Sequence, residues 1–281
     1  MAKEHWYFLM GALAVVLPLC ALYVVKKTGL LESGPDQAIA YKTVNNRVLS
    51  LHAWFAPDRP SGEPAPALLL FHGGRWLYGG PNDFAHQCRW FASQGISCFS
   101  AQYRLGARNI PEVLRALEDA QDALAYLHTH AAALNIDSGR IAAGGGSSGG
   151  HLAAALGTAV TALPAERARP AALVLYNPML DLSPGTPDHH LVRDFWQSVS
   201  PLQHVDAATP PTLVLVGSED PEVPVTTVEA FCAAVSKHGG QCEAAVYPGQ
   251  SHGFFNYWPD NTRYFDETNQ RVLKFLQGIW Q

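Results

Sequence analysis

From about residue 38 onward, short apolar segments alternate along the chain with longer amphipathic ones. Residues 47–55 alternate apolar and polar side chains as a half-buried strand does, and residues 67–71 form the short apolar run of a buried parallel strand. Residues 111–133 repeat apolar side chains at helical spacing and carry a proline near their start. Similar patterns predict strands at 96–103, 141–144, 173–177, 213–216 and 243–247, and helices at 82–93, 148–160, 226–238 and 263–280.

This alternation predicts an α/β fold in which a mostly parallel sheet carries helices on both faces. Residues 183–211 break the rhythm and are rich in Pro, His, Asp and Gln, so we expect them to form a short lid. Ligands of such open sheets bind beyond the carboxyl ends of the strands. The side chains that follow the strands are therefore the candidates for a functional site.

Residues 6–25 differ from the rest of the chain because they contain no charged side chain and no polar face. About twenty apolar residues in a helix match the ~30 Å hydrocarbon core of a bilayer. We expect residues 1–27 to be a single-pass membrane anchor or an uncleaved signal, followed by one globular domain at 28–281. A cleaved signal peptide is the alternative, although Leu19 is unfavourable for cleavage after Ala21.

Lysines and cysteines favour opposite orientations in the membrane. More lysines follow the apolar segment than precede it, which by the positive-inside rule would keep the domain in the cytoplasm. Outside this segment the cysteines form two pairs of equal spacing, Cys88 with Cys98 and Cys232 with Cys242. They are either two disulfides or four buried thiols. We expect an extracytoplasmic domain, or a secreted one if the segment is cleaved.

Composition excludes several classes of protein. The 281 residues, 48% apolar and 15% charged, suffice for one large globular domain. The formal net charge is −5, and no run is rich in Lys and Arg, so nucleic acid is not expected as a partner.

The sequence GGGSSGGH at residues 144–151 lies between a predicted strand and a predicted helix. A serine on such a sharp turn presents its hydroxyl above the sheet and needs small residues two positions before and after it. Ser147 and Ser148 both meet this condition. The segment lacks the Gly-Lys-Ser/Thr of a phosphate-binding loop, which leaves a nucleophilic serine as the interpretation.

The sequence FHGGRW at residues 71–76 also follows a predicted strand. Backbone N–H groups of Gly73, Gly74 and Ser148 could stabilise the negative charge that acyl transfer places on a carbonyl oxygen. We expect Arg75 and Trp76 at the substrate pocket, although packing alone would also explain Trp76.

Candidate acid and base groups follow the last two strands. Asp220 could orient a histidine, with Glu219 and Glu222 as competitors, and His252 could accept and return a proton. The order of oxyanion loop, serine, acid and histidine is that of α/β-hydrolases.

The chain from about residue 67 resembles the hormone-sensitive-lipase-like and acetyl-esterase branch of the α/β-hydrolases. The segments FHGGRW, QYRLG, ALEDAQDALAYL, RIAAGGGSSGGH, LVGSEDPEVPV and YPGQSHGFF carry this resemblance. It implies that Ser147 is the nucleophile, Asp220 the acid and His252 the base, with Ser148 at the oxyanion position. Two positions depart from the branch: Arg75 replaces a frequent third glycine, and Gln102 replaces a frequent aspartate.

These features predict a serine carboxylic ester hydrolase that acts on small, acetyl-like esters through an acyl-enzyme. No cofactor or metal is implied: His189 and His190 beside Asp188 are adjacent, and adjacent residues rarely face one ion. The alternatives are an amidase, formamidase or peptidase on the same fold, or a non-catalytic membrane-tethered module. Glu118 and Asp119 are expected to be a solvated or capping pair.

Overall fold

The computed structural model describes residues 34–58, 62–107 and 112–281. The predicted anchor at residues 1–27 lies outside these ranges. Within them, no helix combines the length and the apolar character that crossing a bilayer requires.

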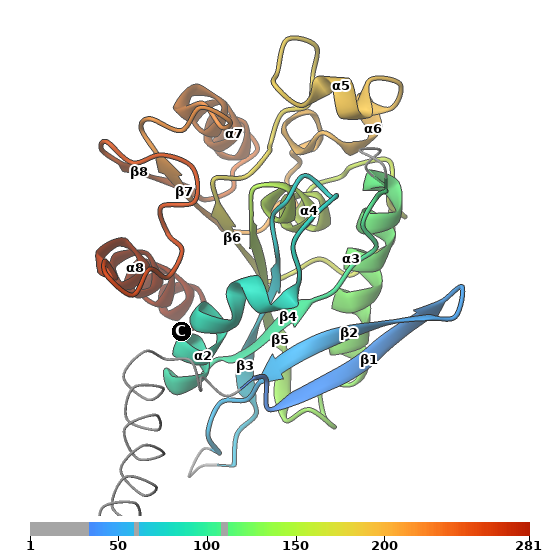
Figure 1. The fold of residues 1–281 in the computed structure, drawn as a ribbon, viewed down its shortest axis with the longest axis vertical. Coiled ribbons are helices and arrows are strands. Elements are labelled where there is room, and N and C mark those ends of the chain that lie inside the picture. The colour runs from blue at the N-terminus through green and yellow to red at the C-terminus, as the bar shows by residue number, and fades with distance from the viewer. Residues whose placement is uncertain (1–33, 59–61, 108–111) are drawn as a thin grey trace, which may run out of the picture. The chain divides into compact units, whose positions relative to one another are not determined.

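Eight strands form one sheet in the order β1-β2-β4-β3-β5-β6-β7-β8 (Figure 1). Strand β2 is antiparallel to both its neighbours, and every pair from β4 to β8 is parallel. The mostly parallel sheet predicted from the sequence is therefore present. The strands are β1 (Gln37–Val44), β2 (Arg47–Trp54), β3 (Ala65–Phe71), β4 (Ser97–Ala101), β5 (Ile136–Gly146), β6 (Ala172–Tyr176), β7 (Thr212–Gly217) and β8 (Cys242–Tyr247).

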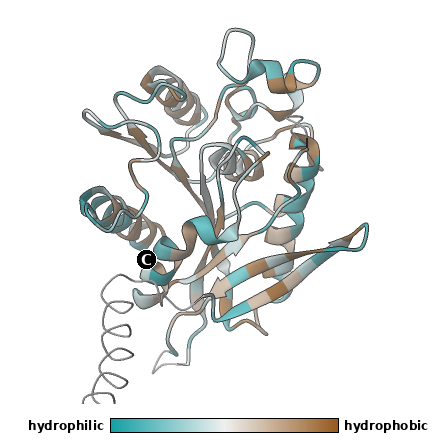
Figure 2. Ribbon diagram, viewed as in Figure 1, coloured by the Kyte–Doolittle hydropathy of each residue, from teal (hydrophilic) through white to brown (hydrophobic). Residues whose placement is uncertain are grey.

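Helices cover both faces of the sheet, as predicted. Strands β3, β6 and β7 are buried along their whole length, and Figure 2 shows the apolar colour concentrated in the strands, with the helices mixed. Such burial on both faces explains their continuous apolar sequences. One core contains α3 (Val113–Thr129), α4 (Ser148–Gly157) and α7 (Val225–Lys237), and the other contains α2 (Ala85–Ser93) and α8 (Arg263–Ile279).

Among the strands of the described sheet, β1 is the one that the sequence did not predict. It pairs with β2 through a tight turn at Asn45 and Asn46, whose φ angles are 48° and 60°. Asparagine tolerates this left-handed conformation better than most residues, and two such residues suit a two-residue hairpin. Because β1 buries only Ile39, its sequence lacks the alternation that identifies β2.

Residues 183–211 connect β6 to β7 through short helical turns, α5 (His189–Val192), α6 (Trp196–Val199) and the 3-10 helix η2 (Pro201–His204) (Figure 1). Val192 and Val199 are fully buried in the core. His151 of α4 donates a hydrogen bond from Nε2 to the Val199 carbonyl oxygen at 2.8 Å. The segment is thus packed on α4.

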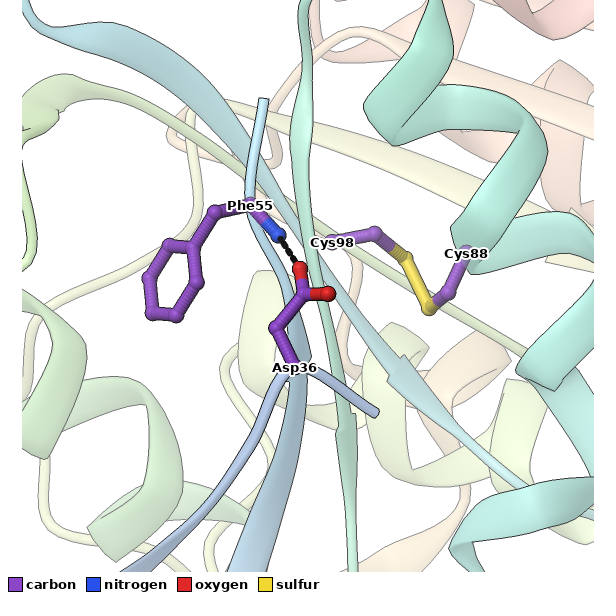
Figure 3. The surroundings of a disulfide bond; sticks show 4 residues. All are labelled: Asp36, Phe55, Cys88 and Cys98. Atoms are coloured by element: carbon purple, nitrogen blue, oxygen red, sulfur yellow. Dashed lines mark hydrogen bonds between the residues drawn. A yellow bond between two sulfur atoms is a disulfide. The ribbon is translucent and has the colours of Figure 1, made fainter. Parts of the chain in front are cut away.

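Both cysteine pairs are disulfides. Cys88–Cys98 joins α2 to β4, and Cys232–Cys242 joins α7 to β8. Figure 3 shows the first of them. Near it, the carboxylate of Asp36 accepts a hydrogen bond of 2.8 Å from the backbone N–H of Phe55, which fastens the start of the hairpin.

The expectation for Glu118 and Asp119 is wrong for one of the two residues. The Glu118 side chain is 60% exposed, but that of Asp119 is fully buried and lies 2.7 Å from both Lys42 Nζ and Arg104 Nη2. Lys42 belongs to β1 and Arg104 follows β4, so their cations reach α3 only after the sheet has formed. A pattern local to the helix could not reveal them.

Candidate active site

The turn between β5 and α4 holds Ser147 in a left-handed conformation with φ of 54°. A Cβ added to Gly149 would collide with the carbonyl oxygen of Phe71, and one added to Gly145 would lie 2.5 Å from the same oxygen. The two glycines therefore let the end of β3 pass directly beneath the serine, as the motif predicted.

Ser147 and Ser148 have different surroundings. Ser147 is 8% exposed and lines a pocket of about 690 Å³. Ser148 is fully buried, and its Oγ accepts a hydrogen bond of 3.4 Å from the Trp76 N–H. Ser147 is thus the one of the two whose side chain can meet a ligand.

Asp220 and His252 are brought together from the ends of β7 and β8. His252 Nδ1 donates a hydrogen bond of 2.8 Å to Asp220 Oδ2. The other carboxylate oxygen accepts from the N–H groups of Glu222 and Val223, at 2.8 and 2.9 Å. The competing Glu219 is exposed. Asp220 is thus the acidic residue held in place to orient the ring.

The contact between Asp220 and His252 shifts the pKa of each residue in the direction that favours its charged form. Burial opposes protonation of His252, but the hydrogen bond and charge of Asp220 outweigh it and raise the pKa of His252 above its ordinary 6.5. For Asp220, burial is outweighed by the hydrogen bonds from His252 and the backbone, so its pKa is lowered. A histidine held this way carries its proton on Nδ1 and leaves Nε2 available as a base.

Asn177, which was not predicted from the sequence, forms a hydrogen bond with His252 Nε2. Its Nδ2 lies 3.2 Å from His252 Nε2, and no hydrogen bond joins His252 to Ser147 among the described residues. Asn177 directly follows β6, is 1% exposed and has φ of 35°. The signal in the sequence that could have identified Asn177 is its position as a polar residue just past a buried strand.

The predicted oxyanion loop lies beside Ser147. A Cβ on Gly73 would be 3.4 Å from the Cβ of Ser147, and Gly74 has φ of 110°. Within the described chain, the N–H groups of Gly73, Gly74 and Ser148 donate to no protein acceptor. Ser148 opens α4, whose N-terminal end is electropositive. The three groups are available to bind an anionic oxygen.

Comparison with known proteins identifies the family. The profile of a family described as having the α/β hydrolase fold matches residues 68–207. A thermophilic esterase from Thermogutta terrifontis, solved with propionate bound, is 32% identical with a TM-score of 0.78, over 86% of this chain and 94% of that one. The chain belongs to the α/β-hydrolase family.

Curated relatives of this hydrolase include an ethyl acetate hydrolase of Pseudomonas putida, 29% identical over 69% of each chain. Esterase LipC of Mycobacterium tuberculosis is 29% identical over 73% of this chain. The hydrolase spans 56% of the length of LipC and 62% of that of LipQ, a second esterase of the same organism.

Arg75 lines the pocket that contains Ser147 and connects three segments of the hydrolase. Its guanidinium lies 3.4 Å from Asp188 of the predicted lid and 3.3 Å from Glu222, which follows Asp220. Glu222 in turn lies 3.8 Å from His252 Nε2. Burial raises the pKa of Asp188 in spite of Arg75.

The expectation that Trp76 walls the substrate pocket is wrong. Its side chain is fully buried, lies edge-on to His151 with ring centroids 5.0 Å apart, and is not among the residues that line the pocket. Arg75 and Trp76 have φ of 54° and 58°, and this tight turn directs the indole into the core. The packing alternative is therefore correct.

The two adjacent histidines of residues 183–211 donate hydrogen bonds to backbone oxygens. His189 Nδ1 donates to the Leu182 carbonyl at 2.9 Å and His190 Nδ1 to that of Pro187 at 3.1 Å. Both rings thus contribute to the structure of their own segment. Among the residues with defined positions, no group of three His, Cys, Asp or Glu side chains could hold a metal ion.

Proposed function

We propose that this α/β-hydrolase is a serine carboxylic ester hydrolase in which Ser147 is the nucleophile, His252 the general base and acid, and Asp220 its orienting partner. The observation that carries the proposal is that Ser147, on its strained turn, lines a pocket together with His252, which is bonded to Asp220. The relatives named as esterases support ester hydrolysis.

In the first half-reaction, Ser147 Oγ attacks the ester carbonyl carbon while His252 Nε2 takes the hydroxyl proton. The π electrons move to the carbonyl oxygen, where the N–H groups of Gly73, Gly74 and Ser148 stabilise the charge, each by about 3 kcal/mol. The bond from carbon to the alkoxy oxygen then breaks. His252 gives its proton to the departing alcohol, and the acyl group remains on Ser147.

In the second half-reaction, His252 takes a proton from water as the water oxygen attacks the acyl carbon. The bond to Ser147 Oγ breaks, the carboxylic acid leaves, and the proton returns to Ser147. Asn177 must release Nε2 in each cycle. Its amide N–H has to move away before Nε2 can accept the proton of Ser147.

Two observations support the proposal that the acyl part of the substrate is small. The similar Thermogutta esterase was solved with propionate and with butyrate bound. In this chain, Arg75 stands where the related branch often has glycine and holds its charged side chain at the pocket. A long hydrocarbon chain would have to desolvate that charge.

Hydrolysis of p-nitrophenyl acetate by the full chain tests the proposed function. We expect turnover that falls by at least about 10⁴-fold in Ser147→Ala and far less in Ser148→Ala. The octanoate ester should be a poorer substrate than the acetate. Hydrolysis of p-nitroacetanilide at a comparable rate would instead identify an amidase, and full activity in Ser147→Ala would exclude the proposed nucleophile.

We further propose that residues 6–25 anchor the protein in a membrane and that the hydrolase domain lies on its extracytoplasmic side. The uninterrupted apolar sequence supports the anchor. The two disulfides support an oxidising compartment, because thiols in the cytosol are generally kept reduced.

A further inference from the structure

The pocket that contains Ser147 extends well beyond the serine. Its volume of about 690 Å³ is in the range of sites for ligands much larger than an acetyl group. It is bounded by the oxyanion loop, the start of α2 and the loop that follows His252.

Two exposed aromatic rings stand at this pocket. Tyr78 is 62% and Trp258 60% exposed, and they are the aromatic members of the large exposed apolar side chains in the described ranges. Both line the pocket, although they come from distant segments. Beside them, Tyr257 stacks on His86 with centroids 3.9 Å apart. Flat exposed rings at a binding site favour a ligand with a flat, partly apolar face.

Two buried amide side chains line the same pocket, and each has one polar atom without a hydrogen bond in the described protein. Gln87 and Asn177 are each 1% exposed. Gln87 Oε1 and Asn177 Oδ1 have no hydrogen-bond partner in the described protein. Buried polar atoms are rarely left unpaired. Protein atoms cover both oxygens, so a ligand group reaches them when the amide side chain turns toward the pocket. A hydroxyl group suits them, because it can both donate and accept whichever way the amide is turned.

Other alcohol types fit these side chains less well. A hydrocarbon chain would leave both amides unpaired. A cationic alcohol could pair with Asp83, which is exposed and accepts from the neutral Gly80 N–H at 3.1 Å, whereas Glu222 already pairs with Arg75 at 3.3 Å. The two amide oxygens are neutral acceptors, which a hydroxyl group can satisfy without a charge.

We propose that the alcohol part of the substrate is a polyhydroxylated ring, an O-acylated sugar that keeps free hydroxyl groups. One face of the ring lies on Trp258 or Tyr78, and a hydroxyl bonds the Gln87 amide. The inference rests on the proposed function: the sugar oxygen is the leaving group, and it receives the proton that His252 took from Ser147.

A matched pair of acetates tests this inference with the full chain in detergent. Methyl 6-O-acetyl-glucopyranoside and cyclohexylmethyl acetate both carry a primary acetate on a six-membered ring, but only the first has hydroxyl groups. We expect kcat/KM to be about tenfold higher or more for the sugar ester, as one or two well-placed hydrogen bonds and a stacked ring would give.

Variants of the pocket show which side chains produce the preference for the sugar ester. Gln87→Leu and Trp258→Ala should each lower kcat/KM for the sugar ester about five- to tenfold more than for the cyclohexyl ester. Leu114→Ala serves as the control, because this exposed side chain lies on α3 and does not line the pocket. Trp258 is exposed, so its variant remains informative if Gln87→Leu fails to fold.

Equal kcat/KM for the two acetates, or equal losses for both in Gln87→Leu and Trp258→Ala, would overturn the sugar inference. Hydrolysis of p-nitrophenyl acetate would then still support the esterase. Absence of p-nitrophenyl acetate hydrolysis in the wild type would instead reject the esterase itself, so the two failures are distinguishable.

Discussion

A residue with a side chain rarely adopts the backbone conformation of Ser147, which costs on the order of 1–3 kcal/mol and must be imposed by its surroundings. The requirement for small neighbours is local in the chain, so the motif limited the nucleophile to Ser147 or Ser148, and the family resemblance decided for Ser147. Asn177 was not predicted because its partner, His252, follows a different strand. The assignment of Asp220 over Glu219 needed the family resemblance, since both follow the same strand.

Substitution of Gly149 tests the close approach at the turn. Gly149→Ala would drive a methyl group into the Phe71 carbonyl, so we expect the free energy of unfolding to fall by about 3 kcal/mol or more, with loss of esterase activity. Gly278→Ala is the control, because nothing lies within 4 Å of its added Cβ near the end of α8. It should leave stability unchanged or raise it by up to about 1 kcal/mol. Equal stability of the two variants in urea denaturation would contradict the geometry.

The raised pKa of His252 makes a prediction about pH. The base must be unprotonated, so kcat/KM should rise with pH and reach half its plateau above 6.5. Asp220→Asn removes the charge that raises the pKa, so we expect the midpoint to move down and the plateau to fall about 10³–10⁴-fold. The exposed Glu219→Gln should keep the wild-type profile. If the midpoint of the pH profile did not move in Asp220→Asn, Asp220 would not be the residue that raises the pKa of His252.

At the scale of elements, each predicted helix and long apolar strand is present with ends shifted by a few residues. The periodicity of an element reports its own burial, which is why the nearly continuous burial of β3 and β7 was recognisable and the exposed β1 was not. Contacts between elements were less predictable. The spacing of the cysteines allowed thiols or disulfides, and the burial of Asp119 required cations from β1 and the loop after β4.

The disulfides differ in burial although both span ten residues. Closing a loop of this length stabilises a fold by about 3 kcal/mol, so Cys88→Ala with Cys98→Ala should lower the free energy of unfolding by about that amount. In native protein, reductant should open Cys232–Cys242 first, because Cys88 and Cys98 are fully buried and the other pair is half-buried. Differential alkylation and mass spectrometry would measure the order. With both disulfides formed, denatured and unreduced protein should show one reactive thiol, that of Cys20, and five reactive thiols would rule out both bonds.

At the scale of the whole molecule, the sheet order assembles the site. Strands β3, β5, β6, β7 and β8 are consecutive neighbours, and the loops that follow them carry in turn the oxyanion loop, Ser147, Asn177, Asp220 and His252. Sequence patterns placed most of these residues after strands, but the order of strands arises from packing. The same topology places Arg75 near Asp188, which lies between β6 and β7, and near Glu222, contacts that no single motif contains.

Membrane attachment is a property of the whole chain. We expect the full protein to remain with membranes after alkaline carbonate extraction, and Leu13→Arg with Val16→Arg to release it, since each arginine costs about 2.5–3.5 kcal/mol in a membrane helix. Removal of residues 1–27 should also release it. A full-length protein that stays soluble, or appears cleaved near Ala21, would contradict the anchor.

The central claim is that Ser147 is the nucleophile, and covalent labelling tests it most directly. After reaction of the full chain with a fluorophosphonate probe, trypsin should yield the peptide of residues 141–167, which contains both candidate serines. We predict a single adduct per chain, placed on Ser147 by fragmentation and absent from Ser147→Ala. An adduct on Ser148, or no adduct on protein that is folded, would contradict the account.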